Sequence, residues 1–180
     1  MSKVTKAFIA LADMARVCRA QARALPSREE KQLFWTGIGI RLNKRLYVCP
    51  LEEVAEILKL PAYTKLPGVG GWVNGVANVR GKLLPLLDMN LFFFDDSSTQ
   101  VQSRRRVLVL DEGEMYTGLI VDQVMGMQHF PNDGFIKSTE GVAEQIKPFV
   151  DGCYQRDGEV WQVFRPKRLL KDARFMKLAG

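Results

Sequence analysis

Histidine and cysteine, the side chains that most often bind metals or act as nucleophiles, are scarce in this chain. His129 is the only histidine, which excludes an H-E-x-x-H zinc motif or a three-histidine metal site and argues against a catalytic triad. Cys18, Cys49 and Cys153 are odd in number, far apart and without a C-x-x-C pair. The sequence therefore predicts no disulfide framework and no metal site, and it suits a reducing cytoplasm.

Long apolar runs are also missing. No run approaches the ~20 residues that a membrane span requires. Residues 1–25 lack the continuous apolar core and the cleavage site of a signal peptide. We therefore expect a cytoplasmic protein with no direct membrane insertion.

Motifs for phosphate binding or catalysis are absent as well. Five residues separate Gly75 from Gly81, and Leu83 stands where a Walker motif has its serine or threonine. The glycines within residues 68–71 lack the spacing of a dinucleotide-binding loop. Because no credible nucleophile or acid–base pair is found either, the sequence predicts a protein that is not an enzyme and binds no cofactor.

Positive charge is concentrated at one end of the chain. The net charge is +6, from 26 basic and 20 acidic residues, and residues 1–28 hold six of the basic and one of the acidic ones. The other residues, 20 basic and 19 acidic, leave the rest of the chain nearly neutral. This placement weakens the case for nucleic acid as a partner, which the net charge alone would raise.

Residues 1–28 have the periodicity of an amphipathic helix. Apolar side chains alternate in steps of four and three, and Pro26 ends the pattern; they are Val4, Phe8, Leu11, Ala15, Cys18, Ala22 and Leu25. We expect a helical extension that either lies on the rest of the protein or engages a partner helix or an anionic surface.

After this extension the apolar period changes to two, which is typical of strands. The expected strands are residues 34–42, 45–49, 106–111, 115–122, 149–155 and 159–164. Residues 50–60 fit either a helical turn or a strand edge, and Pro166 opens a closing helix through Lys177. Many short strands with few helices predict a mainly β protein, as a barrel or a sandwich.

The most informative segment is residues 75–88, which predicts a β-hairpin. Arg80-Gly81-Lys82 forms the bend, where glycine tolerates positive φ, and a leucine-rich strand follows. We expect Leu83, Leu84 and Leu86 mainly in the core. The arginine suits protein docking, because it presents up to five donors and keeps its charge, but it also fits a solvated turn.

This segment resembles the signature of CheW-type chemotaxis adaptors. The matching residues are Gly75, Asn78, Arg80, Gly81, Pro85 and Asp88, and Met89 departs from the family's leucine. Residues 54–57 (Val-Ala-Glu-Ile) and 118–124 (Gly-Leu-Ile-Val-Asp-Gln-Val) resemble two further blocks of the family. The resemblance covers residues 33–170 and looks most like the PilI branch, the adaptors of type IV pilus twitching systems.

The resemblance implies two packed five-stranded SH3-like β-barrels with an N-terminal amphipathic helix and a short C-terminal helix. The implied parts are an extension of residues 1–28, a CheW-like domain of residues 33–170, and the end of the C-terminal helix with a tail in residues 171–180. The implied function is a non-catalytic adaptor at membrane-associated receptor arrays. Its partners would be the cytoplasmic tip of a methyl-accepting chemoreceptor and the regulatory domain of a CheA-type histidine kinase, which shares the double-barrel fold.

The resemblance also implies which residues bind these partners. Glu56 and Arg80 correspond to an acid and an arginine that form a charge pair, and Val54, Ile57 and Gly75 would line an apolar receptor groove. The implied protein-binding residues are Val54, Glu56, Ile57, Gly75, Asn78, Arg80 and Gly81. The charge pair would alternatively only stabilise the barrel, and the sequence leaves both readings open.

One departure from the family and one alternative function remain. Residues 163–166 (Val-Phe-Arg-Pro) stand where the family commonly has Leu-Asp, so a base replaces an acid and we expect the closing helix to dock differently.

The alternative function is a nucleic-acid-binding barrel that uses residues 104–106 (Arg-Arg-Arg) beside residues 92–94 (Phe-Phe-Phe). Three successive phenylalanines cannot all face one side of a strand, so at least one is expected in the core.

Overall fold

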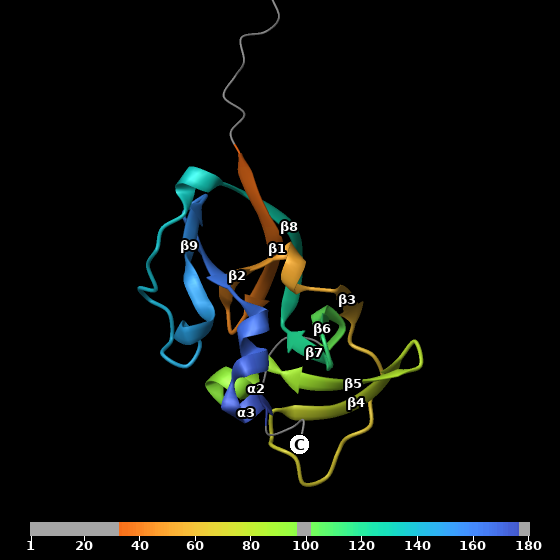
Figure 1. Ribbon diagram of the computed structural model, residues 1–180. Coiled ribbons are helices and arrows are strands. Elements are labelled where there is room, and N and C mark those ends of the chain that lie inside the picture. Colours follow the sequence, from red (N-terminus) through yellow and green to blue (C-terminus); the bar gives the residue numbers. More distant parts are fainter. Residues whose placement is uncertain (1–32, 97–101, 177–180) are drawn as a thin grey trace, which may run out of the picture. The chain divides into compact units, whose positions relative to one another are not determined.

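The computed structural model describes residues 33–96 and 102–176, which form strands and short helices (Figure 1). The strands are β1 (Phe34–Leu42), β2 (Arg45–Pro50), β3 (Glu56–Lys59), β4 (Val73–Val79), β5 (Lys82–Asp88), β6 (Arg106–Glu112), β7 (Met115–Val121), β8 (Gln123–Pro131), β9 (Val150–Arg156) and β10 (Glu159–Phe164). The helices are α2 (Met89–Phe94), α3 (Ala173–Met176) and the 3-10 helices η1 (Leu51–Glu53), η2 (Gln102–Arg104), η3 (Asn132–Gly134), η4 (Lys147–Phe149) and η5 (Pro166–Lys171). The predicted N-terminal helix of residues 1–28 lies outside the described residues.

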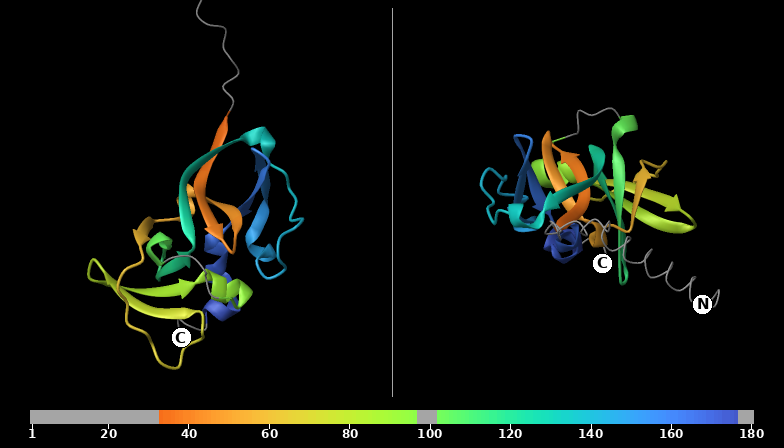
Figure 2. Two further views of the ribbon diagram at one scale, coloured as in Figure 1. Left: turned by 180° about the vertical axis from the view of Figure 1, so that it is seen from behind. Right: turned by 90° about the horizontal axis from the view of Figure 1, so that it is seen from above.

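The strands form two five-stranded sheets (Figure 1 and Figure 2). The order is β8-β1-β2-β10-β9 in sheet A and β3-β6-β7-β5-β4 in sheet B. Sheet B uses consecutive strands, whereas sheet A combines the first two strands with the last three. The chain therefore crosses from sheet A to sheet B after β2 and returns after β7. The prediction of a mainly β fold with two five-stranded units is confirmed.

The two sheets follow one plan. Strands β3 to β7 take the same relative places in sheet B that β8, β9, β10, β1 and β2 take in sheet A, and the parallel pair β5–β7 corresponds to β10–β2. Hairpins β4–β5 and β9–β10 also correspond. Each turns through two residues with positive φ, Arg80-Gly81 in the first and Asp157-Gly158 in the second. Positive φ at both loop residues gives a turn whose twist matches that of the paired strands.

Several strands bury both faces. In β2, Leu46 and Val48 belong to the core of sheet A, while Tyr47 and Cys49 belong to a larger core that both sheets share. Strands β6 and β7 alternate in the same way between the core of sheet B and the shared core. Because side chains alternate across a strand, each of these strands can pack in two cores at once. Residues from α2 and η5 complete the shared core.

Alternation also decides which leucines of β5 are buried. Leu84 and Leu86 are fully buried, as predicted. The prediction that Leu83 is mainly core is wrong, because this side chain is 70% exposed. Leu83 points to the opposite face from Leu84, and it lies close to the bend, whereas Leu87 on the same face reaches the shared core.

The segment that the sequence left open contains both a helix and a strand. The 3-10 helix η1 follows β2, and β3 then pairs antiparallel with β6. The closing segment begins at Pro166, as predicted, but it is not one continuous helix. Asp172 has an extended backbone, with φ −72° and ψ 132°, and it separates η5 from α3.

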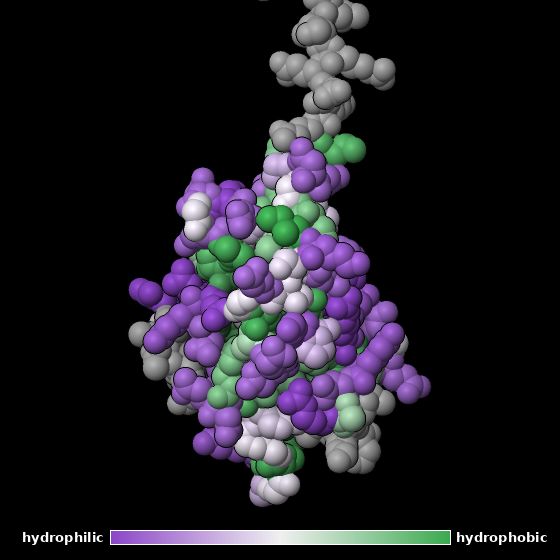
Figure 3. Space-filling view, turned by 90° about the vertical axis from the view of Figure 1, so that its left-hand side faces the viewer, coloured by the Kyte–Doolittle hydropathy of each residue, from purple (hydrophilic) through white to green (hydrophobic). Residues whose placement is uncertain are grey.

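The two described cysteines are free and buried. Burial raises the pKa of both the Cys49 and the Cys153 thiols, which disfavours the reactive thiolate. No helix in residues 33–96 and 102–176 has both the length and the apolar character needed to cross a membrane. On the face shown in Figure 3, hydrophobic side chains remain visible between hydrophilic ones, as is usual for a protein surface.

The glycine at position 75 gives a test of this fold. A Cβ atom at Gly75 would lie 2.1 Å from the carbonyl oxygen of Thr64, and the φ of 144° is strained for any other residue. We predict that Gly75→Ala lowers the free energy of unfolding by roughly 3 kcal/mol in urea denaturation. Gly81→Ala is the matched control: its φ is also positive but its Cβ would meet open space, so we expect a loss of about 1 kcal/mol. Equal losses would contradict the close approach at Thr64.

Candidate functional site

The bend between β4 and β5 is shaped by three of the signature residues. Val79 pairs with Lys82, which leaves Arg80 and Gly81 as a two-residue loop with φ values of 53° and 82°. The side-chain oxygen of Asn78 accepts a hydrogen bond of 2.9 Å from the N–H of Gly81. Asn78 and Gly81 therefore hold the loop in the conformation that presents Arg80 to solvent.

Arg80 forms the ion pair with Glu56 that the sequence predicted. Its Nη2 atom lies 2.5 Å from Oε1 of Glu56 in β3. Because β3 and β4 are opposite edges of sheet B, the contact requires the sheet to curl until its edges approach. The side chains are 78% exposed at Arg80 and 28% exposed at Glu56. An ion pair this exposed contributes at most about 1 kcal/mol to stability.

Apolar side chains are exposed on the same strands. Ile57 in β3 is 39% exposed and Leu83 in β5 is 70% exposed. We use the name Arg80 surface for the side chains at this end of sheet B, namely Glu56, Ile57, Arg80, Lys82 and Leu83. Glu56, Arg80 and Lys82 line one pocket, whereas Ile57 and Leu83 point to the other face of their strands. The mixture of charged and apolar groups in the Arg80 surface suits contact with another protein, in which apolar contacts are surrounded by polar ones.

The other two predicted groove residues lie further inside. Val54 is half-buried and packs against the shared core. Gly75 is buried, and the close approach that requires a glycine there comes from the protein's own Thr64. Val54 and Gly75 thus support the strands on which the Arg80 surface lies. A direct contact of either residue with a partner stays a prediction.

Two acids of the family blocks act inside the protein. Asp88 is buried, caps the start of α2 and lies 2.6 Å from Nη2 of Arg105. Asp122, between β7 and β8, accepts hydrogen bonds from Nδ2 of Asn90 at 2.6 Å and from the N–H of Asn43 at 2.9 Å. Since Asn43 lies in the β1–β2 turn and Asn90 in α2, Asp122 ties sheet A to the helix between β5 and β6 of sheet B.

The residues of the nucleic-acid alternative do not form an exposed stacking platform. Phe92 and Phe93 are buried in the shared core. Arg105 is paired with Asp88, and Arg106 donates to the backbone carbonyls of Ser103 and Arg105. Bases could therefore not stack on these two rings without unfolding α2.

The only histidine of the sequence lies on the surface. His129 is exposed on the edge strand β8, where its Nδ1 lies 2.8 Å from Oγ1 of Thr36. Within residues 33–96 and 102–176, no three His, Cys, Asp or Glu side chains are arranged to hold a metal ion.

Sequence reasoning missed two features, one exposed and one largely buried. The buried pattern of Leu84 and Leu86 would have placed Leu83 on the opposite, open face of β5. The ion pair between Glu53 and Arg165 joins positions far apart in the sequence, so no local pattern signals it.

Comparisons with known proteins agree with the fold and with the family resemblance. The profile of the CheW-like domain family matches residues 36–174. A protein named PilI from Pseudomonas aeruginosa is 42% identical over 179 residues, which cover 99% of each chain. A chemotaxis protein CheA from Klebsiella aerogenes is 30% identical over 95 residues, 52% of this chain and 14% of that protein. The crystal structure of the scaffolding protein TtCheW from Thermoanaerobacter tengcongensis matches with a TM-score of 0.63 at 22% identity, covering 73% of this chain and 89% of that one. The resemblance noted in the sequence, including the branch, is thereby confirmed.

The ion pairs Arg105–Asp88 and Arg80–Glu56 differ in how exposed their side chains are, and this difference gives a second prediction. We expect Arg105→Gln to lower the free energy of unfolding by roughly 3 kcal/mol, because it leaves the buried Asp88 carboxylate without its charge partner. Glu56→Gln, the matched change at the exposed pair, should alter it by less than about 1 kcal/mol. Urea denaturation measures both. A large loss for Glu56→Gln would show that the Arg80 pair stabilises the barrel.

Proposed function

This chain belongs to the CheW-like domain family, and we propose that it is a non-catalytic adaptor that couples the cytoplasmic tip of a chemoreceptor to the regulatory domain of a CheA-type histidine kinase. The adaptor role follows from membership of the family. The chemoreceptor and the CheA-type kinase are proposed in addition as its specific partners. They are supported by the geometry at Arg80 and by the similarity to CheA.

The conformation of Arg80 is the observation that carries the proposal. Its φ of 53° lies in the left-handed region, which costs a residue other than glycine about 1 kcal/mol or more. Asparagine or glycine would suit this loop position better. The exposed ion pair with Glu56 returns little stability. The strained backbone alone does not distinguish Arg80, because Lys44 has it as well. The guanidinium that Glu56 holds in place at the strained bend is what supports a contact outside the protein.

The match to CheA supports a kinase as one partner. A segment of CheA resembles about half of this chain, so the kinase contains a region that is similar to the adaptor itself. Two modules of one fold can present equivalent ends to each other and to a third protein, and several weak contacts at fixed geometry then add in strength. The similarity to PilI supports an output in type IV pilus twitching motility.

The proposed binding residues divide into two roles. Glu56, Ile57 and Arg80 would contact a partner, and the exposed Leu83 extends their surface. Val54, Gly75, Asn78 and Gly81 would position them. We further propose that the protein works in the cytoplasm at membrane-associated receptor arrays, without binding nucleic acid. Residues 1–28 would be an extension, residues 33–170 the CheW-like domain, and residues 171–180 the end of the C-terminal helix with the tail.

Replacement of Arg80 by asparagine tests the proposal, because asparagine tolerates positive φ. We predict that Arg80→Asn leaves the free energy of unfolding unchanged or raises it by up to about 1 kcal/mol. Binding should nevertheless weaken at least tenfold, since a charged docking group is lost. Co-sedimentation with receptor-containing membranes and purified kinase measures the binding, and urea denaturation measures the stability.

Lys44→Asn is the matched control for this experiment. Lys44 is also an exposed base at positive φ in a two-residue turn, but it lies in the β1–β2 hairpin of sheet A. We expect the Lys44→Asn variant to bind the receptor and the kinase with an affinity within twofold of that of the unchanged protein. Equal losses for the two variants, or full binding by Arg80→Asn, would refute a docking role for Arg80.

A further inference from the structure

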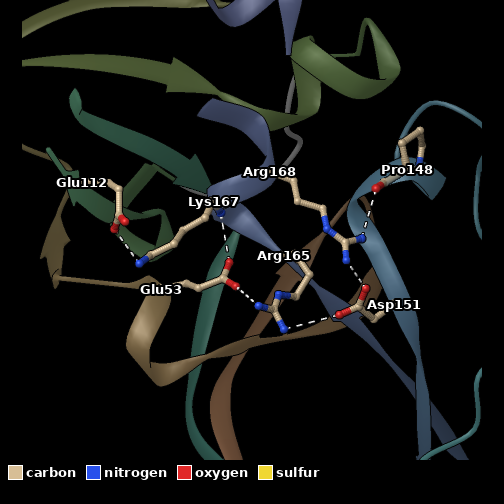
Figure 4. Close-up of polar contacts among 7 residues, drawn as sticks. All are labelled: Glu53, Glu112, Pro148, Asp151, Arg165, Lys167 and Arg168. Carbon is tan, nitrogen blue, oxygen red and sulfur yellow. Dashed lines mark hydrogen bonds and ion pairs between the residues drawn. The ribbon is translucent and has the colours of Figure 1, made fainter. Parts of the chain in front are cut away.

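A cluster of charged side chains surrounds the end of β10 (Figure 4). Arg165, between β10 and η5, points its guanidinium at two acids. Nη2 lies 2.5 Å from Oε1 of Glu53, and Nη1 lies 3.4 Å from Oδ2 of Asp151. One arginine therefore bridges η1, which leads from sheet A to sheet B, and β9 of sheet A.

Glu53 is the buried member of the cluster. Its side chain is only 3% exposed, and its second oxygen accepts a hydrogen bond of 3.0 Å from the N–H of Lys167. A buried carboxylate is strongly unfavourable unless it is paired and hydrogen-bonded. Glu53 thus requires both partners, which ties η1 to the start of η5.

The helix η5 is in turn fixed to both sheets. Arg168 pairs with Asp151 of sheet A, and Nζ of Lys167 lies 2.5 Å from Oε2 of Glu112 at the end of β6 in sheet B. The hydrogen bond with Glu112 raises the pKa of Lys167. Leu169 and Leu170 of η5 are buried in the shared core. Helix η5, which carries two of the basic side chains of the cluster, is therefore held by contacts with both sheets and with the shared core.

The segment that Glu53 anchors leads directly into the Arg80 surface. Glu56 follows Glu53 by three residues, and the intervening Ala55 donates its N–H to the carbonyl of Val109 in β6 at 2.8 Å. Val54 is half-buried beside the shared core. The position of η1 thus sets where β3 starts and where the Glu56 carboxylate lies relative to Arg80.

We propose that Glu53 and Arg165 are positioning residues that hold η1 and the start of β3 in the geometry that the Arg80 surface needs. The consequence for binding rests on the proposed function, but the local structural effect does not. The base at position 165 is explained by this pairing. An acid there would bring a third carboxylate close to Glu53 and Asp151 and leave Glu53 without a charge partner.

Amide hydrogen exchange of the full chain tests the proposal. In Arg165→Gln, exchange at residues 53–59 should quicken at least tenfold, while exchange in the β1–β2 hairpin stays within twofold. Arg168→Gln is the matched control, because Arg168 shares Asp151 but does not contact Glu53, and it should leave residues 53–59 within twofold. Since Arg165→Gln could unfold the protein, the double variant Glu53→Gln with Arg165→Gln is included. By removing the unpaired buried charge, it should fold, but because it also lacks the ion pair, exchange at residues 53–59 should still be at least threefold faster than in the unchanged protein.

The outcomes separate this proposal from the proposed function. Unchanged exchange at residues 53–59 in Arg165→Gln, an effect equal to that of Arg168→Gln, a uniform rise across all strands, or full protection in the double variant would each overturn the positioning role. Binding is read by the same co-sedimentation, where Arg165→Gln should weaken binding at least tenfold and Arg168→Gln less than twofold. Failure of the unchanged protein to bind would refute the proposed function and leave the exchange result standing.

Discussion

The fold depends on strands that have no solvent face. Strands β2, β6 and β7 each pack one side in the core of their own sheet and the other in the core that both sheets share. A carboxylate buried beside this shared core is strongly unfavourable unless it is paired and hydrogen-bonded inside the protein. Buried acids meet that requirement where the chain crosses between the sheets, Glu53 after β2 and Asp122 after β7. Each of these acids joins segments that are distant in the sequence.

The way the strands pack also bears on the exposed charged side chains at the hairpin bends. Near its tip the β4–β5 hairpin packs one face, with Ala77 and Leu84, in the core of sheet B, and the hydrogen bond between Asn78 and Gly81 fixes the loop that carries Arg80. The two corresponding tips, Arg80-Gly81 and Asp157-Gly158, share a backbone conformation but carry opposite charge. A common backbone with a different side chain indicates that the fold requires the turn but not a particular charge at its first position.

Much of the fold could be predicted from the sequence, because its cues are local. Alternation located most strands, and glycine after a charged residue located the two corresponding hairpin turns. Residues 51–53 could not be assigned, since a 3-10 helix of three residues has no periodicity to read and Arg165, which pairs with Glu53, comes from the far end of the chain. Leu83 was misplaced because hydrophobicity was given more weight than its position next to the bend. For the site, the Glu56–Arg80 contact followed from the family resemblance alone, whereas the inward role of Gly75 required knowledge of where Thr64 passes.

The central claim is that another protein contacts the exposed arginine of the β4–β5 bend. An NMR titration of the isotope-labelled protein with the purified regulatory domain of its kinase, and separately with a receptor-tip fragment, tests this most directly. The account predicts that for at least one partner the largest shift changes fall on residues 56–57 and 80–83, with little change in the buried strands. Saturating binding by both partners that leaves those resonances unmoved would contradict it.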